Sequence, residues 1–119
     1  MSTGPQELRD RTKAFAIRIV RLYRSLPHTA DSQVVGKQLL RCGTSVAANY
    51  RAACRGRSRD EWIAKIGLVV EEADESVFWL EMLSDGSIVR SEKCEDILKE
   101  ARELSAIFTS SQHTARRVS

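Results

Sequence analysis

The sequence has little of what usually interrupts a helix, because proline occurs only at Pro5 and Pro27. Long helices are therefore unobstructed over most of the chain, and no segment carries a strand signal. No apolar run approaches the roughly 20 residues that a helix needs to cross a bilayer. The polar beginning, Met-Ser-Thr-Gly-Pro-Gln-Glu, lacks the apolar core of a signal peptide. We therefore expect a cytoplasmic, all-α protein that does not enter a membrane.

Residues that build metal centres and catalytic sites are also sparse. The three cysteines, Cys42, Cys54 and Cys94, are odd in number and widely spaced, which fits neither a disulfide framework nor a zinc pattern. The two histidines, His28 and His113, lack the Glu-x-x-His motif of a di-iron bundle. No glycine-rich phosphate loop is present. The sequence thus predicts a protein that is not an enzyme and that needs no metal or cofactor.

Acidic residues are missing between Asp31 and Asp60, although six basic residues lie there. These are Lys37, Arg41, Arg51, Arg55, Arg57 and Arg59. At about 100° per residue, the first four fall within an arc of about 80° on one helix face. Like charges four residues apart repel each other and weaken an isolated helix. An anionic partner or an acidic surface of the assembly must therefore offset this basic stripe.

The charge of the whole chain is divided in the same way. Residues 1–59 hold twelve Lys/Arg and three Asp/Glu, a balance of +9, whereas residues 60–119 hold seven and thirteen, a balance of −6. A basic half can bind nucleic acid. The two halves can equally bind each other, within one subunit or between copies. The charge pattern alone leaves both alternatives open.

Four segments repeat apolar residues at alternating steps of four and three, the pattern of a bundle seam. The seam positions are Leu8, Thr12, Phe15, Ile19, Leu22 and Leu26; Val35, Leu39, Cys42, Val46, Asn49 and Ala53; Trp62, Ile66, Val69, Ala73, Ser76, Leu80 and Leu83; and Cys94, Ile97, Ala101, Leu104, Phe108 and Ser111. Because the connections are short, we expect an antiparallel, up-down-up-down four-helix bundle. The predicted helices cover about residues 7–26, 32–55, 59–84 and 91–111, in one domain of residues 1–112 with a basic, disordered tail at 113–119.

Polar residues at the helix starts and on one seam have predicted structural roles. Asp31 or Ser32 is expected to cap the second helix, and Ser58 with Glu61 fits a capping box for the third. Asn49 falls on the seam of the second helix. A buried asparagine must find hydrogen-bond partners, and at such a position it often fixes register or assembly state. We therefore interpret Asn49 as structural.

The third helix is apolar on more than one side, and a helix of this kind is usually covered on more than one side. Several residues that lie away from its seam are large and apolar, and carboxylates share their side. One bundle cannot cover both sides, so a second subunit is the natural cover. The sequence therefore predicts an oligomer interface made by Leu68, Glu71, Asp74, Glu75, Phe78 and Met82.

Two stretches of the chain carry a family resemblance. They are QLLRCGTSVAANYRAACRGRSRDEW, residues 38–62, and EEADESVFWLEML, residues 71–83. The chain resembles, from about Phe15 to Phe108, the four-helix-bundle family encoded in intervening sequences of bacterial large-subunit ribosomal RNA genes. That family also includes the accessory protein of diversity-generating retroelements. Ala52 stands where many relatives have glutamate, which indicates another branch of the family.

The resemblance implies a four-helix bundle that assembles into a homopentameric ring without known catalytic activity. For the retroelement branch it implies binding of nucleic acid, DNA or RNA, and of a reverse transcriptase through a basic surface. We therefore expect a non-enzymatic adaptor that binds nucleic acid largely without sequence preference through the six basic residues. Arg18, Arg21 and Arg24 could extend that surface. The alternative is a structural or protein-interaction module whose basic face pairs with the acidic third helix of a neighbouring subunit.

Overall fold

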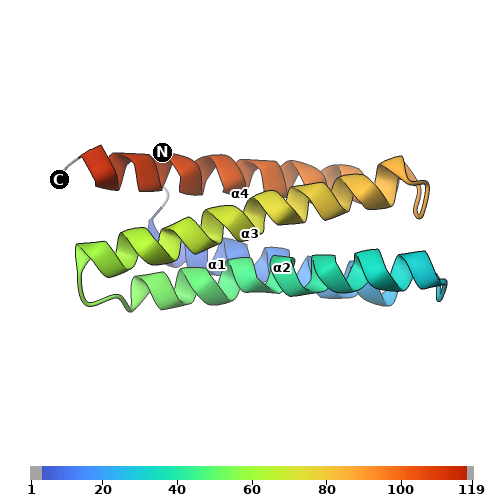
Figure 1. Cartoon of the computed structure of the whole chain (residues 1–119), viewed down its shortest axis with the longest axis horizontal. Coiled ribbons are helices and arrows are strands. Elements are labelled where there is room, and N and C mark those ends of the chain that lie inside the picture. The colour runs from blue at the N-terminus through green and yellow to red at the C-terminus, as the bar shows by residue number, and fades with distance from the viewer. Residues whose placement is uncertain (1–3, 118–119) are drawn as a thin grey trace.

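The computed structural model describes residues 4–117 and folds into four α-helices (Figure 1). They are α1 (Pro5–Arg24), α2 (Ala30–Cys54), α3 (Arg59–Asp85) and α4 (Ser91–Arg117). The described residues contain no strand, which confirms the predicted all-α, four-helix fold. The molecule measures 47 × 25 × 21 Å, which fits helices of about 40 Å laid along the long axis. Within residues 4–117, no helix is long and apolar enough to span a membrane.

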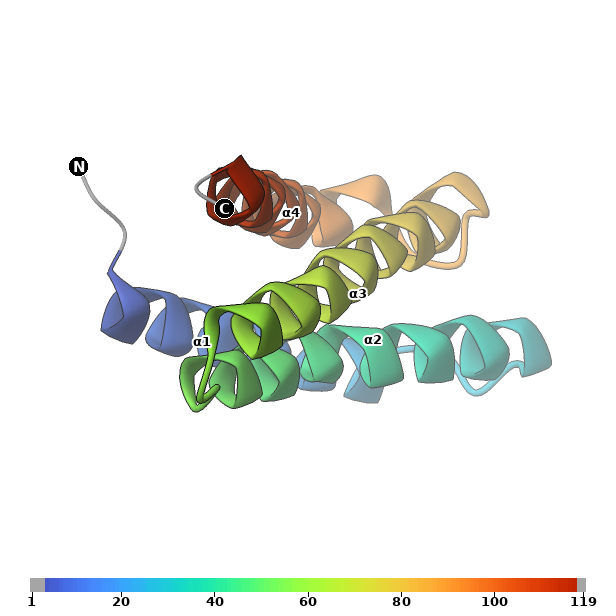
Figure 2. The same cartoon turned by 60° about the vertical axis from the view of Figure 1, so that its left-hand side comes forward.

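The central pair of the bundle is α2 and α3. α2 packs against α1 and α3, and α3 packs against α4, whereas α1 and α4 share the smallest contact. Figure 2 shows α3 lying between α2 and α4. The three connections lie at alternating ends of the long axis in Figure 1. The N-terminal half of α1 is consequently at the same end of the molecule as the C-terminal half of α2.

The predicted seam positions form the core. They are buried, apart from Leu22, Asn49, Trp62 and Ser111, which are half-buried. Among the largest fully buried side chains are Phe15, Ile19, Leu39, Ile66, Leu80, Leu104 and Phe108. Burying one such side chain contributes about 1.5–3 kcal/mol, so the alternating four-three spacing is what holds the four helices together.

Asn49 does not lie in the buried seam, contrary to the prediction. Its side chain is half-exposed, and its Nδ2 donates to the Ser45 carbonyl one turn earlier, at 3.0 Å. Tyr50 takes the core position instead, with its ring centroid 5.1 Å from that of Phe108. A straight helix drifts by about 20° per heptad relative to a strict seven-residue repeat. Tyr50 therefore replaces Asn49 as the core residue of this turn of α2, and the seam continues at Ala53.

The helix starts are capped by hydroxyl side chains. α2 begins two residues earlier than predicted, because Thr29 rather than Asp31 or Ser32 is its N-cap and accepts from the Ser32 N–H. The predicted cap of α3 is confirmed, since the Ser58 Oγ accepts from the Glu61 N–H at 3.1 Å. Such a cap stabilises a helix by about 1 kcal/mol.

The predicted tail is wrong from residue 113 to residue 117, because α4 continues to Arg117. No proline or glycine interrupts this segment. Gln112 packs over Gly67 of α3, where an added Cβ would lie 2.8 Å from the Gln112 Nε2. Arg59 of α3 donates to the Ala115 carbonyl at 2.7 Å. Contacts from α3 thus extend α4 beyond its apolar seam. Residues 118 and 119 lie outside the described residues.

Candidate nucleic-acid interface and the outer face of α3

The outer side of α2 carries the basic stripe. Lys37, Arg41, Arg51 and Arg55 are all exposed, as their helical spacing predicts, and Arg57 is exposed in the connection that follows. The surroundings of these cations nevertheless differ along the helix. The difference lies in what the neighbouring helices place beside each of them.

Arg41 is engaged by α3 of its own chain. Its Nη1 lies 3.4 Å from the Glu72 carboxylate, and its Nη2 pairs with Glu75. Glu75 also accepts from the Trp79 indole N–H at 3.1 Å, and the Gln38 Oε1 accepts from the Arg41 Nη2 at 3.3 Å. Arg41 and Glu75, predicted to contact nucleic acid and a neighbouring subunit, thus bind each other within one subunit. The charge of Arg41 is therefore offset within its own subunit.

Arg59 also has an internal role. Its bond to the Ala115 carbonyl joins the first turn of α3 to the last turns of α4. The carbonyl end of a helix carries partial negative charge, so a cation is favourable there. This contact makes Arg59 a link between two helices.

Farther along α2, basic side chains of α1 join the stripe. Arg51 of α2 lines a shallow hollow of about 200 Å³ together with Gln6, Arg9, Asp10 and Lys13 of α1. Arg9 donates to the Gln6 Oε1 at 2.7 Å, and the Gln6 amide donates to Asp10 at 2.9 Å. In the described part of the chain, no ion pair engages the side chains of Arg9, Lys13 or Arg51. Their charges remain available to an anion.

We call this cluster, with the two arginines that follow it, the basic end. It consists of Arg9, Lys13, Arg51, Arg55 and Arg57. Sequence reasoning missed Arg9 and Lys13, and extended the stripe to Arg18, Arg21 and Arg24 instead. The predicted antiparallel packing of the first two helices could have indicated Arg9 and Lys13. It places the start of the first helix, not its end, beside the C-terminal part of the second.

A pocket of about 400 Å³ adjoins the basic end, and all four helices contribute to its lining. We call it the end pocket. Leu8 and Ala53, both buried, line it together with the half-buried Trp62. Arg9 lines both this pocket and the hollow beside Arg51. The two concavities therefore adjoin each other at Arg9.

Tyr50 and Cys54 complete the α2 wall of the end pocket. Tyr50 is 4% exposed; burial, followed by its hydrogen bond with Cys54, raises the pKa of its phenol, so the ring stays neutral. Cys54 is half-buried, whereas Cys42 and Cys94 are buried. Burial raises the pKa of both these other thiols. Cys54 is consequently the most accessible thiol of the three.

The outer side of α3 exposes the predicted apolar residues. Leu68, Phe78 and Met82 are 41%, 50% and 39% exposed. Phe78 meets the Trp79 ring edge-on, with centroids 4.8 Å apart. Large apolar side chains gathered on one helix face are typical of an interaction surface.

Two of the carboxylates on this side, predicted to face a neighbouring subunit, bind residues of their own subunit. Glu75 pairs with Arg41 of α2, and Asp74 accepts from the Ser105 hydroxyl of α4. Both carboxylates therefore join α3 to other helices of the same subunit. Glu71 is exposed on the same side. The interface predicted for a second subunit thus reduces to the apolar face and Glu71.

The small contact between α1 and α4 is reinforced by one arginine. Arg11 lies 2.7 Å from both the Glu100 and Glu103 carboxylates. The Arg11 hydrogen bond, opposed by burial, lowers the pKa of Glu100 below its ordinary value. Glu100 is therefore charged at neutral pH and holds α4 against α1.

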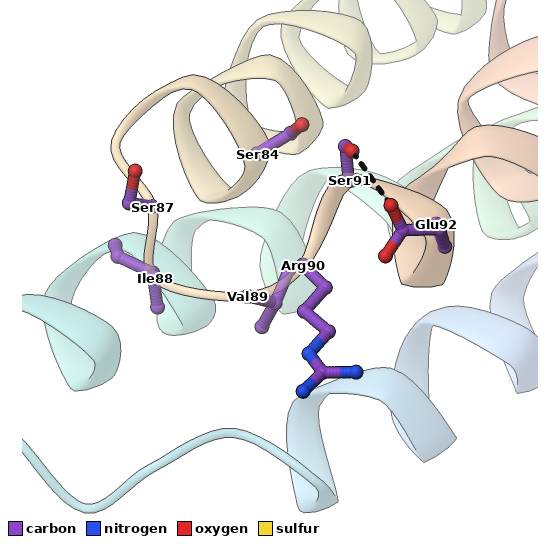
Figure 3. Close-up of a pocket in the computed structure, with 7 residues that line it drawn as sticks. All are labelled: Ser84, Ser87, Ile88, Val89, Arg90, Ser91 and Glu92. Carbon is purple, nitrogen blue, oxygen red and sulfur yellow. Dashed lines mark hydrogen bonds between the residues drawn. The ribbon is translucent and has the colours of Figure 1, made fainter.

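A wide hollow of about 650 Å³ lies at the opposite end of the bundle, in the α3–α4 connection (Figure 3). Ser84, Ser87 and Ser91 line it, and Figure 3 shows the Arg90 side chain pointing away from the Ser84 and Ser87 hydroxyls. The lining contains no histidine or lysine that would activate a serine nucleophile, and its carboxylate, Glu92, accepts only a long hydrogen bond of 3.5 Å from Ser91. Residues 4–117 also contain no group of three or more side chains suited to hold a metal ion.

Two comparisons with known proteins found matches. Residues 6–110 match the model of the 23S rRNA-intervening sequence protein family. A solved structure from Bacteroides thetaiotaomicron, a protein of unknown function from the S23 ribosomal protein family, is 36% identical with a TM-score of 0.81. The match covers 87% of this chain and 96% of that one. No curated protein matches. The chain therefore belongs to the 23S rRNA-intervening sequence protein family.

Proposed function

We propose that this protein is a non-enzymatic, cytoplasmic adaptor that binds nucleic acid through its basic end. The observation that carries the proposal is the hollow in which Arg9 and Lys13 of α1 meet Arg51 of α2, with Arg55 and Arg57 following. Phosphate groups are the natural ligands of such a cluster, because guanidinium groups bind their oxygens with charge-assisted hydrogen bonds. Lys37 of the original stripe extends the surface toward the other end of α2.

Binding of this kind is expected to depend weakly on base sequence. Contacts to phosphates position a nucleic acid but carry no sequence information, and no base-reading element is evident. Each phosphate that the protein neutralises releases counterions, so affinity falls steeply with salt. The log–log slope is about −0.9 per phosphate on duplex DNA and about −0.7 on a single strand.

The proposal includes a homo-oligomeric ring of up-down bundles, with five subunits as the family resemblance implies. Leu68, Phe78 and Met82 support it, because a lone subunit leaves these side chains in water. A head-to-tail contact between unlike surfaces closes a ring when the rotation is right. Several basic ends on one ring strengthen binding through avidity. A protein partner such as a reverse transcriptase would use the same ring; no membrane is involved.

The test is a salt titration of DNA and RNA binding, run beside light scattering. Arg51→Glu with Arg55→Glu should abolish binding and leave the oligomer intact. Lys93→Glu with Lys99→Glu is the matched control, since both lysines are exposed on α4 and the change in charge is the same. The control should bind like the parent. A parent that binds neither nucleic acid at low salt would refute the proposal.

The structural alternative has one observation in its favour. Arg41 already pairs with Glu72 and Glu75 of α3, so basic residues of α2 do satisfy acidic residues of α3, here within one subunit. If Arg51 and Arg55 bind Glu71 of a neighbouring subunit in the same manner, their reversal should break the ring. Loss of the oligomer in that variant, together with a parent that does not bind nucleic acid, would establish the structural module instead.

A further inference from the structure

The end pocket adds a second kind of contact beside the basic end. We propose that it receives an unpaired base of single-stranded nucleic acid while the basic end holds the neighbouring phosphates. This inference rests on the proposed function and specifies its ligand. The preferred ligand is a single strand, DNA or RNA.

The first argument is proximity. Arg9 lines both the end pocket and the hollow that Lys13 and Arg51 share. Because the two concavities share Arg9, a strand whose phosphates follow the hollow comes within one side chain of the pocket. A base attached to that strand can enter the pocket without leaving the cationic surface.

The second argument is the chemistry of the lining. Apolar and aromatic contact comes from Leu8, Ala53 and Trp62. The ring of Tyr50 is held in place by its packing on Phe108. The lining includes one cation, Arg9, and no carboxylate. A flat, uncharged ring joined to an anionic backbone matches this combination. Stacking of bases on aromatic side chains tolerates any sequence because every base has a π-face.

The third argument concerns size and pairing. A volume of about 400 Å³ lies within the usual range of small-ligand pockets, about 300–1,000 Å³. A base inside a duplex cannot enter without being extruded from the stack, which costs free energy. The Ser111 hydroxyl donates to the Ile107 carbonyl, and the Ser58 hydroxyl accepts from the Glu61 N–H. The Ser58 hydroxyl keeps its own O–H, so Ser58 and Arg9 are the main polar side chains left to contact the edge of a base.

The experiment compares two strands of equal charge. One is an oligothymidylate of about 20 nucleotides, and the other is an abasic strand of the same length, both longer than a typical single-strand site. The parent should bind oligothymidylate about 5- to 150-fold more tightly, the range that one stacked base contributes. Equal affinities would overturn the inference and leave the proposed function standing. A parent that binds neither strand would overturn both.

Two variants change the pocket and leave the basic end in place. Trp62→Leu removes the aromatic wall, and Ser111→Met fills the pocket from α4. Each should bring the two affinities together, with abasic-strand binding unchanged as the control for folding and charge. A preference that survives in both variants would contradict the inference.

The reactivity of Cys54 measures the occupancy of the pocket independently of affinity. Alkylation of Cys54 by iodoacetamide, followed by mass spectrometry, should slow when oligothymidylate is bound at saturation. The abasic strand at saturation should protect it much less. Cys42 and Cys94 are buried and serve as internal references. Equal protection by the two strands would show that the base does not enter the pocket.

Discussion

The two halves of the basic stripe on α2 have different neighbours in the structure, although both are runs of exposed basic residues in the sequence. Arg41 lies beside α3, which brings Glu72 and Glu75 to its guanidinium. Arg51 lies beside the start of α1, which brings Arg9 and Lys13 together with one carboxylate, Asp10, that forms no ion pair with Arg51. One half of the stripe therefore joins two helices of the bundle, and the other half concentrates charge. The identity of the neighbouring helix, rather than the stripe itself, determines whether a cation remains available to a ligand.

The largest expected effect is loss of the oligomer, which would leave the basic end on a single subunit. Leu68→Glu with Phe78→Glu places two charges on the apolar face of α3 and should yield the 13.4 kDa monomer by light scattering. Nucleic-acid affinity should fall by about 10²–10⁴-fold, the usual loss of avidity.

Ala106→Glu with Thr109→Glu is the control for that variant, because both residues are exposed on α4. It should assemble and bind like the parent. If the α3 variant remains an oligomer of the parent's size, the apolar face does not form the interface.

Packing between α1 and α2 brings the two parts of the basic end together, and Gly43 makes that packing possible. An alanine Cβ at Gly43 would lie 2.8 Å from the Ile19 Cγ1 in the core, so Gly43→Ala should lower the free energy of unfolding by about 1–3 kcal/mol through overpacking. The gain in helix propensity, about 1 kcal/mol, offsets part of this loss. Urea denaturation at fixed protein concentration measures the difference.

Gly67 provides the matched substitution on the other side of the bundle. An alanine there meets only the flexible end of Gln112. Gly67→Ala should therefore be neutral or more stable than the parent, by up to about 1 kcal/mol. Equal destabilisation by both alanines would contradict the assigned packing.

A smaller effect is expected from the Arg11–Glu100 pair between α1 and α4. The pKa of Glu100 is lower in the folded chain than in the unfolded chain, so its contribution is present above the unfolded pKa and is lost as the pH falls through the folded one. Unfolding measured from neutral to acidic pH should show this loss, of about 1 kcal/mol or less. Glu100→Gln should flatten that part of the profile, and an unchanged profile would refute the assignment.

Much of this fold could be predicted from the sequence, because a four-three repeat fixes which side of each helix is buried. Phe15, Leu39, Leu80 and Phe108 were predicted in the core and lie there. The exchange of Asn49 for Tyr50 could not be read from a strict repeat, because the helix drifts against it. The position at which α4 ends depends on contacts with α3, and the spacing of apolar residues along the sequence does not predict those contacts.

The candidate site was less predictable, for a related reason. The charge pattern gave the exposed face of α2 but not the partners of each cation. Arg41 and Glu72 lie on opposite sides of the α2–α3 connection, and their pairing depends on the register between the two helices. Arg9 and Lys13 belong to another helix and reach Arg51 only through the packing of α1 on α2. Side-chain partners across helices must be seen in three dimensions.

The most direct measurement compares Arg51→Gln with Arg41→Gln in a salt titration of duplex binding. Each variant removes one positive charge from the same face of α2. Arg51→Gln should weaken binding and reduce the log–log slope by about 0.9 for each phosphate that the variant no longer neutralises. Arg41→Gln should leave the slope unchanged and lower stability by about 0.2–1 kcal/mol. An equal reduction of the slope in the two variants, or a reduction in Arg41→Gln alone, would contradict the division of the stripe.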